Sequence, residues 1–284
     1  MSTDAQQLPA AHCRSEYDAL RHVLLCPPRF MKITDVINDV QKRYKEENID
    51  VTEALRQHAV FVDALTAAGV NTTFLEAAEQ YPEQVFTRDI GFTIGDTVFI
   101  SEMAESVRQG EEMVLQNWLT DHHIQFQHVP GHRIEGGDVL VDRGTVYIGI
   151  SSRTSQEAIN ELQRHVPDFQ VVPVHLKEKY LHLDCVFNVL SPTEALIFPE
   201  ALEDETIAML EKRYTLIHVD ADEQFKLGTN VLSIGNRRLF SQPQNNKVNT
   251  QLRDHGFDVI EVDFSEIIKS GGAFRCCTMP VVRD

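Results

Sequence analysis

In GGDVLVDRGTVYIGIS (136–151), two short apolar runs flank the turn residues Asp142-Arg143-Gly144, a pattern that predicts a β-hairpin. A helical pattern over residues 155–165 follows, and the chain then returns in the apolar strand FQVVPV (169–174). The same order of hairpin, helix and strand recurs along the chain. A repeated unit of about 45 residues indicates a repeat architecture.

The final strands of four units define the period of this repeat. They begin at Ile124 (IQFQHV), Phe169 (FQVVPV), Tyr214 (YTLIHV) and Phe257 (FDVIEV), with spacings of 45, 45 and 43 residues. An earlier unit begins at RHVLLCPP (21–28), and the chain ends in a glycine-rich turn and strand, GGAFRCCTMPVV (271–282). We therefore count five similar units.

One such unit cannot bury its small sheet alone, whereas five arranged radially can cover one another and leave a narrow centre. We predict the α/β class: a single domain over residues 1–284, folded as a five-bladed α/β propeller with pseudo-fivefold repeats and a helix outside each blade. Residues 1–17 are predicted to be a flexible lead-in. An open doubly wound sheet is the alternative, but hairpins in every unit favour the propeller, because parallel sheets do not need them.

Composition restricts the partners of this chain. The formal net charge is −17, from 43 acidic and 26 basic residues, which argues against nucleic acid or an anionic membrane as partner. No run of 18 apolar residues and no secretory signal is present, and five cysteines without CxxC spacing suggest reduced thiols. We expect a cytoplasmic protein with a small-molecule substrate, and we leave assembly into a homo-oligomer open.

Polar residues arrive at the same point of successive units. Asp89, Glu135, His182 and Gly228 each precede the first strand of a unit, at intervals of 46, 47 and 46 residues. A closed ring would gather these positions around one axis. The gathering of two carboxylates and a histidine at one point predicts an active site.

Other candidate residues lie close to these positions. Asp138 follows Glu135 across two glycines, which permit close approach to a ligand, and we count it as substrate-binding. Asp184 is predicted to share one face of a strand with His182. Cys276 and Cys277 are predicted to face opposite ways in a strand, and Arg275 with the preceding glycine turn favours the thiolate of Cys276.

Together these groups suit a planar guanidinium, whose paired N–H donors match carboxylates. Asp89 and Asp184 are predicted to clamp it while the Cys276 thiolate attacks its central carbon. His182 would protonate the leaving amine and later activate water. Glu135 would orient the imidazole and keep it protonated, because a nearby negative charge favours the imidazolium.

Four motifs in this order, TRD (87–89), EGGD (135–138), HLD (182–184) and GGAFRC (271–276), resemble those of the guanidine-modifying enzymes of the amidinotransferase superfamily. That group includes dimethylarginine dimethylaminohydrolases, arginine deiminases and amidinotransferases. The chain is similar to the first in size and to the second in its motifs. The resemblance runs from residue 21 onward and implies the five-bladed propeller known as the pentein fold.

The resemblance also implies roles for individual residues. Cys276 becomes the nucleophile that forms a covalent thiouronium, His182 the general acid and base, and Glu135 its partner. Asp89 and Asp184 become guanidinium ligands, and Arg153, in GISSRT (149–154), grips the substrate carboxylate. The implied enzyme needs no cofactor and no metal, and it hydrolyses a guanidino group of arginine or methylarginine to citrulline plus ammonia or an amine.

Several alternatives remain open from the sequence. An amidinotransferase would share the covalent step and pass the amidino group to an amine instead of water. A non-catalytic guanidine-binding protein would be expected to lack the nucleophile or the base. A metal hydrolase could use the same Asp, Glu, His and Cys ligands, although the helical His pairs of many zinc enzymes are missing. The loop at residues 27–40 is expected to cover the site.

Overall fold

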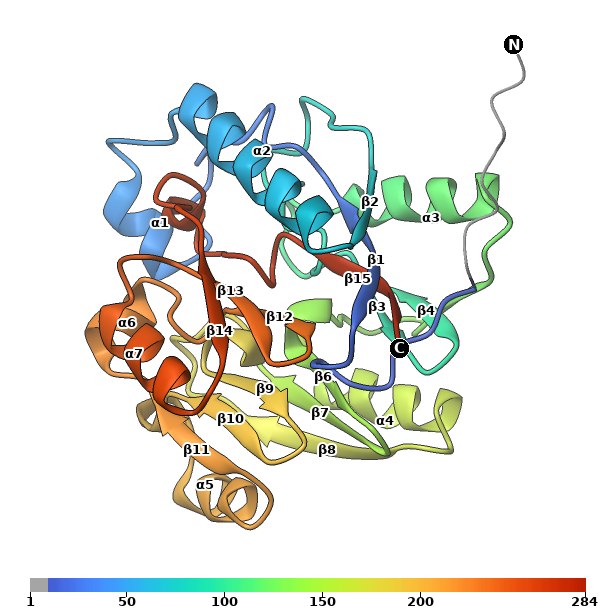
Figure 1. Ribbon diagram of the computed structural model, residues 1–284. Coiled ribbons are helices and arrows are strands. Elements are labelled where there is room, and N and C mark those ends of the chain that lie inside the picture. Colours follow the sequence, from blue (N-terminus) through green and yellow to red (C-terminus); the bar gives the residue numbers. More distant parts are fainter. Residues whose placement is uncertain (1–9) are drawn as a thin grey trace.

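The strands of the computed structural model, which describes residues 10–284, form five small sheets (Figure 1). With their bounds these are β15–β1–β2 (Met279–Arg283, Leu20–Leu25, Asn71–Phe74), β3–β4–β5 (Gly91–Ile94, Thr97–Ile100, Phe126–His128), β6–β7–β8 (Val139–Asp142, Thr145–Ile150, Gln170–His175), β9–β10–β11 (Phe187–Ser191, Glu194–Ile197, Thr215–His218) and β12–β13–β14 (Leu232–Gly235, Arg238–Ser241, Asp258–Glu261). In each sheet an antiparallel pair is followed by a strand parallel to the middle one. This mixed α/β arrangement confirms the predicted unit of hairpin and returning strand.

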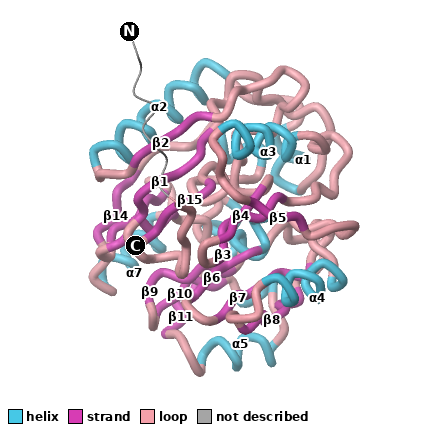
Figure 2. The backbone as a smooth tube through the Cα atoms, turned by 90° about the vertical axis from the view of Figure 1, so that its right-hand side faces the viewer, coloured by secondary structure: helices cyan, strands magenta, loops and turns pink. Residues whose placement is uncertain are grey.

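The helices lie outside the strands (Figure 2). They are α1 (Asp39–Tyr44), α2 (Val51–Ala67), α3 (Glu111–Asp121), α4 (Gln156–His165), α5 (Asp204–Glu211), α6 (Ala221–Phe225) and α7 (Asn246–Asp254), with short 3₁₀ turns η1 (Gly136–Asp138), η2 (Leu183–Cys185), η3 (Pro199–Ala201) and η4 (Ile267–Ser270). Helix α3 begins at Glu111, directly after Gly110, which adopts a left-handed conformation with φ of 100°. Within residues 10–284, no helix is long and apolar enough to cross a membrane.

The first sheet is built from both ends of the chain. The C-terminal strand β15 pairs antiparallel with β1, with Val23 opposite Pro280 and Leu24 opposite Met279, and β2 then pairs parallel on the other side of β1. In Figure 1 the blue β1 and the red β15 lie side by side. The segment that carries Cys276 is therefore fixed next to the start of the fold.

The prediction of a flexible lead-in is wrong for residues 11–17. Cys13, Glu16 and Tyr17 are buried, and the segment bridges to other parts of the chain at Gly95 and Asp142. The segment is held by backbone bridges and by buried side chains, both charged and apolar, and the periodicity of the sequence does not reveal such contacts. Residues 1–9, the rest of that prediction, lie outside the described part of the chain.

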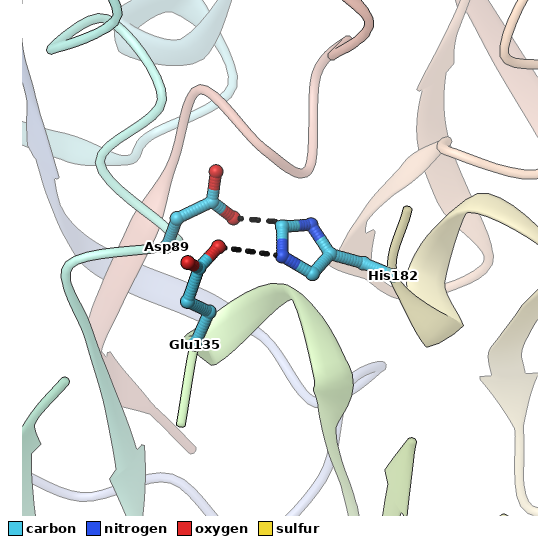
Figure 3. Close-up of side chains that lie close together, drawn as sticks. All are labelled: Asp89, Glu135 and His182. Carbon is cyan, nitrogen blue, oxygen red and sulfur yellow. Dashed lines mark hydrogen bonds and ion pairs between the residues drawn. The ribbon is translucent and has the colours of Figure 1, made fainter. Parts of the chain in front are cut away.

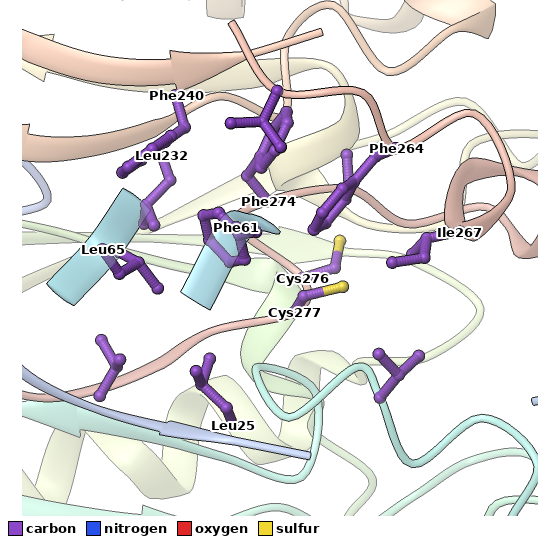
Figure 4. Packing of buried hydrophobic residues seen from close by; sticks show 14 of the residues in the cluster. Leu25, Phe61, Leu65, Leu232, Phe240, Phe264, Ile267, Phe274, Cys276 and Cys277 are labelled. Atoms are coloured by element: carbon purple, nitrogen blue, oxygen red, sulfur yellow. The ribbon is translucent and has the colours of Figure 1, made fainter. Parts of the chain in front are cut away.

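A cluster of buried aromatic side chains packs α2 against the sheets (Figure 4). Phe61 has no exposed surface, and its ring lies edge-on to Phe240 and Phe264, with both pairs of ring centroids 5.1 Å apart. Edge-to-face pairs stabilise a core beyond the area that they bury. Cys276 and Cys277 belong to this cluster, so its packing bears directly on the position of Cys276.

Replacing Phe61 with Ala should therefore lower the free energy of unfolding by about 3–5 kcal/mol, because a large ring is removed from a filled core. Chemical denaturation followed by circular dichroism measures this loss. The matched control is Val60→Ala on the same helix, where the side chain is 45% exposed and the change should stay within about 0.5 kcal/mol. Equal losses in the two variants would contradict this description of the core.

Candidate active site

The candidate residues lie on turns that precede the first strand of successive sheets. Asp89 comes just before β3, Glu135 opens the turn η1 before β6, and His182 opens η2 before β9. Cys276 lies in a turn before β15, at the same point of its sheet. One structural position is thus used repeatedly: Asp89, His182 and Cys276 line one pocket, and Glu135 lies behind His182, to which it is bonded.

Two local predictions were wrong in the same way. His182 and Asp184 are not on a strand, because residues 183–185 form the 3₁₀ turn η2, closed by a bond from the Val186 N–H to the Leu183 carbonyl. Cys276 is likewise in a turn, which the Cys277 N–H closes on the Ala273 carbonyl at 2.9 Å. A short motif whose residues alternate with the period of a strand also fits a single tight turn, so the alternation of residue types was not enough to assign these motifs to strands.

His182 lies between two carboxylates (Figure 3). Its Nε2 is 2.8 Å from Glu135 Oε2, and its Nδ1 is 3.7 Å from Asp89 Oδ1. Gly137 makes this approach feasible, since a Cβ there would lie 2.6 Å from His182 Nδ1 and 2.9 Å from Asp89 Oδ1. Gly137 of the EGGD motif thus leaves room for His182 and Asp89 to approach each other.

The charges around His182 favour its protonated form. Burial by itself would lower the pKa of His182, but the carboxylates of Asp89, Glu135 and Asp138 outweigh it and raise the pKa well above its usual value. Burial would raise the pKa of Glu135, yet the hydrogen bond and the charge of His182, together with Arg153, lower it. The pair is therefore an imidazolium and a carboxylate at neutral pH.

Cys276 is 2% exposed and is held by a residue that sequence reasoning missed. The Asn230 side-chain amide donates to Cys276 Sγ at 3.2 Å, while its oxygen accepts from the backbone N–H groups of Arg275 at 3.1 Å and Cys276 at 3.3 Å. Asn230 lies two residues after Gly228, so the repeat phase that led to Gly228 carried the signal. The amide fixes the sulfur and offers it a hydrogen-bond donor.

Asp184 lies beside the sulfur of Cys276. Its two oxygens are 3.8 and 4.0 Å from Cys276 Sγ, and its Oδ2 is 3.3 Å from Arg275 Nε. Burial raises the pKa of Asp184, and the charge of Arg275 opposes this rise. A cation bound to this carboxylate would lie next to the sulfur of Cys276.

One of the two carboxylate oxygens of Asp89 is bonded to the buried Arg108, a second residue that sequence reasoning missed. Arg108 Nη1 lies 2.6 Å from Asp89 Oδ2, and Arg108 Nη2 lies 2.8 Å from Glu111 Oε2. Asp89 Oδ1 is buried and has no hydrogen-bond partner among residues 10–284. One oxygen of Asp89 thus anchors the side chain, and the other is available to a ligand.

Asp138 and Arg153 differ in how many of their polar atoms already form hydrogen bonds within the protein. Asp138 Oδ1 accepts from the Leu183 N–H at 2.9 Å, which supports the turn that carries His182, and Asp138 Oδ2 accepts from Ser151 Oγ at 2.7 Å, so both oxygens are already used. Arg153 donates from Nη2 to the Ile37 carbonyl at 3.0 Å, whereas Nε and Nη1 have no hydrogen-bond partner within the described chain. Arg153 lines the pocket and keeps donors for a ligand.

The segment around α1 closes the pocket, as the loop at 27–40 was expected to do. Ile37 and Asn38 line it, and Asn38 Nδ2 donates to the Ser270 carbonyl at 3.0 Å. Gln41 Nε2 donates to Glu83 Oε1 at 2.8 Å, and burial raises the pKa of Glu83 to about 7. Polar contacts therefore hold this cover in place.

Asp89, Glu135 and His182 are the described groups that could hold a metal ion, with ligand atoms within 4.8 Å of one another. Their present contacts work against this, because His182 Nε2 is already bonded to Glu135. A metal on this nitrogen would have to replace the proton that the carboxylates stabilise.

Comparisons with known proteins agree with this geometry. A family model described as "N,N dimethylarginine dimethylhydrolase, eukaryotic" matches residues 27–283. The uncharacterised protein YkgA of Bacillus subtilis is 51% identical over 271 residues, 95% of each chain. An arginine deiminase of Bacillus cytotoxicus is 29% identical over 256 residues, which cover 71% of this chain and 62% of that protein.

Solved structures share the fold. The N-terminal domain of ArgZ, a cyanobacterial arginine dihydrolase, gives a TM-score of 0.86 at 24% identity and covers 94% of this chain and 98% of that one. SxtG, an amidinotransferase from Microseira wollei, gives 0.83 at 17% identity and covers 97% and 98%. The match to the family model spans nearly the whole chain, and with it the chain belongs to the N,N-dimethylarginine dimethylhydrolase family, among the guanidine-modifying enzymes of the amidinotransferase superfamily.

Proposed function

We propose that this protein hydrolyses the guanidino group of an arginine-like substrate, arginine or a methylarginine, to citrulline plus ammonia or an amine. The observation that carries the proposal is the single buried pocket that contains Cys276, His182 and Asp89, with Asp184 beside the sulfur. These are a nucleophile, a proton donor and carboxylates for a cation.

The guanidinium would bind between the free oxygen of Asp89 and the carboxylate of Asp184. Paired N–H donors of a guanidinium match such acceptors in one plane. Because Asp184 Oδ2 is 3.8 Å from Cys276 Sγ, a guanidinium held there presents its central carbon to the sulfur. A terminal nitrogen that carries two methyl groups has no N–H left, so this geometry favours arginine and monomethylarginine over asymmetric dimethylarginine.

The reaction then proceeds in two steps. The sulfur attacks the guanidinium carbon as a thiolate, and the His182 imidazolium gives its proton to the leaving nitrogen, which departs and leaves a thiouronium on Cys276. Neutral His182 next takes a proton from water, whose oxygen attacks the same carbon and expels the sulfur as a thiolate, while the second proton of the water passes to solvent as the ureido product becomes neutral. Glu135 keeps His182 oriented, and the Asn230 amide donates to the sulfur.

The tail of the substrate would meet the two arginines of the pocket. Arg153 has unused donors, and Arg108 lines the same pocket, so a substrate carboxylate finds positive charge there. Asp138 would act through the backbone of Leu183, by positioning His182, and would not touch the substrate.

We infer that the five sheets form a closed five-bladed α/β propeller. The pairing of β15 with β1 supports this, because it joins the two ends of the chain within one sheet. The use of one turn position in successive sheets is a second support, since radial arrangement brings such turns to a common axis.

The experiment that tests the function is a colorimetric ureido assay on arginine, monomethylarginine, asymmetric dimethylarginine and agmatine, with and without an acceptor amine. We expect citrulline from arginine or monomethylarginine, and little from agmatine, which lacks the carboxylate that Arg153 would bind. Product that requires the acceptor amine would instead identify an amidinotransferase. No product from any substrate would overturn the proposal.

Replacing Cys276 with Ser should reduce turnover by at least ~10³-fold, because the covalent step needs the sulfur nucleophile. Quenched wild-type reactions analysed by mass spectrometry should show the substrate-derived adduct on Cys276, and the variant should show none. Cys277→Ser is the control: burial raises the pKa of Cys277 far above its usual value, so this thiol is inert. Equal loss of activity in both variants would exclude Cys276 as the sole nucleophile.

Replacing Glu135 with Gln should shift the alkaline limb of the kcat profile to lower pH by about 1–2 units. The carboxylates raise the pKa of His182, so its proton is present at neutral pH and is lost as pH rises; without Glu135 it is lost earlier. Glu105→Gln is the matched control, because Glu105 contacts Arg153 at 3.5 Å and is 38% exposed. An unchanged alkaline limb in Glu135→Gln would contradict the assignment of His182 as general acid.

A further inference from the structure

The N-terminal segment, residues 11–17, is fastened across three sheets. The N–H of Cys13 and the carbonyl of Gly95 bond at 2.8 Å, with the reverse bond at 2.7 Å, in the turn between β3 and β4. Tyr17 Oη donates to Asp142 Oδ1 at 2.7 Å, at the end of β6, and the His12 N–H donates to the Val281 carbonyl of β15. These contacts hold the intervening residue, Glu16, in one position.

Glu16 is 4% exposed and is surrounded by donors. Its Oε1 accepts from Arg88 Nη2 at 3.1 Å and from the Val141 N–H at 2.9 Å, and its Oε2 accepts from Arg275 Nη1. Burial by itself would raise the pKa of Glu16, but Arg275 and Arg88 hold it well below its usual range. Glu16 is therefore a buried, fully charged carboxylate shared by two arginines.

Both arginines are next to residues of the pocket. Arg88 precedes Asp89, and its backbone N–H donates to the Cys276 carbonyl at 3.0 Å. Arg275 precedes Cys276, and its Nε is 3.3 Å from Asp184 Oδ2. The two guanidinium groups also share the Val139 carbonyl, at 2.7 and 3.1 Å, so like charges stand side by side in the interior.

We propose that Glu16 is a positioning residue for the active site, which from the N-terminal segment neutralises Arg88 and Arg275 and so limits how far these arginines neutralise Asp184, the carboxylate assigned to a cationic substrate. Without Glu16, two buried positive charges would lack this counter-charge, and Asp184, already 3.3 Å from Arg275 Nε, would be the carboxylate left to balance them. The pocket would become more positive at the nucleophile. The assignment of Asp184 to the substrate rests on the proposed function, whereas the coupling of Glu16 to Cys276 does not.

The test is the pH dependence of iodoacetamide alkylation of Cys276 in the Cys277→Ser background, measured by mass spectrometry. A more positive surrounding favours the thiolate, so Glu16→Gln should lower the midpoint of the rate profile by about one pH unit. Arg88→Gln removes a positive charge instead and should raise the midpoint. A loss of packing alone would not move the two variants in opposite directions.

The matched control is Tyr17→Phe, which removes the hydroxyl contact that pins the same segment and leaves all charges near Cys276 in place. Its midpoint should equal that of the parent, even if its thermal stability falls. An unchanged midpoint in Glu16→Gln, or shifts of the same sign in Glu16→Gln and Arg88→Gln, would overturn the proposal. If Glu16→Gln does not fold, an unchanged midpoint in Arg88→Gln overturns it and a raised midpoint supports it.

A second readout joins this inference to the reaction. In the folded Glu16→Gln enzyme, KM for the cationic substrate should rise about threefold to tenfold, while Tyr17→Phe keeps the parent value. An altered alkylation profile without any turnover in the parent would leave Glu16 as a positioning residue and remove the hydrolase proposal. If the parent enzyme is active but Glu16→Gln has the same alkylation profile as the parent, the hydrolase proposal stands and the role of Glu16 is overturned.

Discussion

The antiparallel pairing of β15 with β1 is the constraint on which the site depends. It fixes the turn that carries Cys276 beside the turns of the earlier sheets, although Cys276 lies more than 180 residues after Asp89. The buried N-terminal segment also lies against β15, through its contacts with Val281 and Val282.

The interior of the molecule is an arrangement of alternating buried charges. His182 lies between Asp89 and Glu135, Arg108 lies between Asp89 and Glu111, and Glu16 lies between two arginines. Each of these groups would be costly to bury alone, and each is compensated by a neighbour of opposite charge. Such a network stabilises little by itself, but it sets which groups are protonated. The proposed hydrolysis, which needs an imidazolium beside a sulfur nucleophile, would depend on these protonation states.

Much of this could be predicted from the sequence, because the repeat period is long and regular. The hairpins, the returning strands and the gathering of Asp89, Glu135 and His182 followed from it. The missed residues, Arg108, Asn230 and Glu16, each bond to several partners, most of them far away in the sequence, and no periodicity reports such contacts. The turns at 182–185 and 273–277 were misassigned because a few residues with strand-like alternation also fit a tight turn.

The cover of the pocket explains how so buried a site can exchange ligands. Its first residues, Met31 and Ile33, are buried among apolar side chains and act as an anchor, whereas the part over the pocket is held by Asn38 and Gln41 through hydrogen bonds. Opening therefore exchanges polar contacts for water and exposes little apolar surface, which costs less than unpacking a core. With the cover in place the pocket would exclude water, and the attraction between its carboxylates and the proposed guanidinium substrate would be stronger in the lower effective dielectric constant. The cover and the charge network would therefore work together, because the buried charges have their full effect only when the cover keeps water out of the pocket.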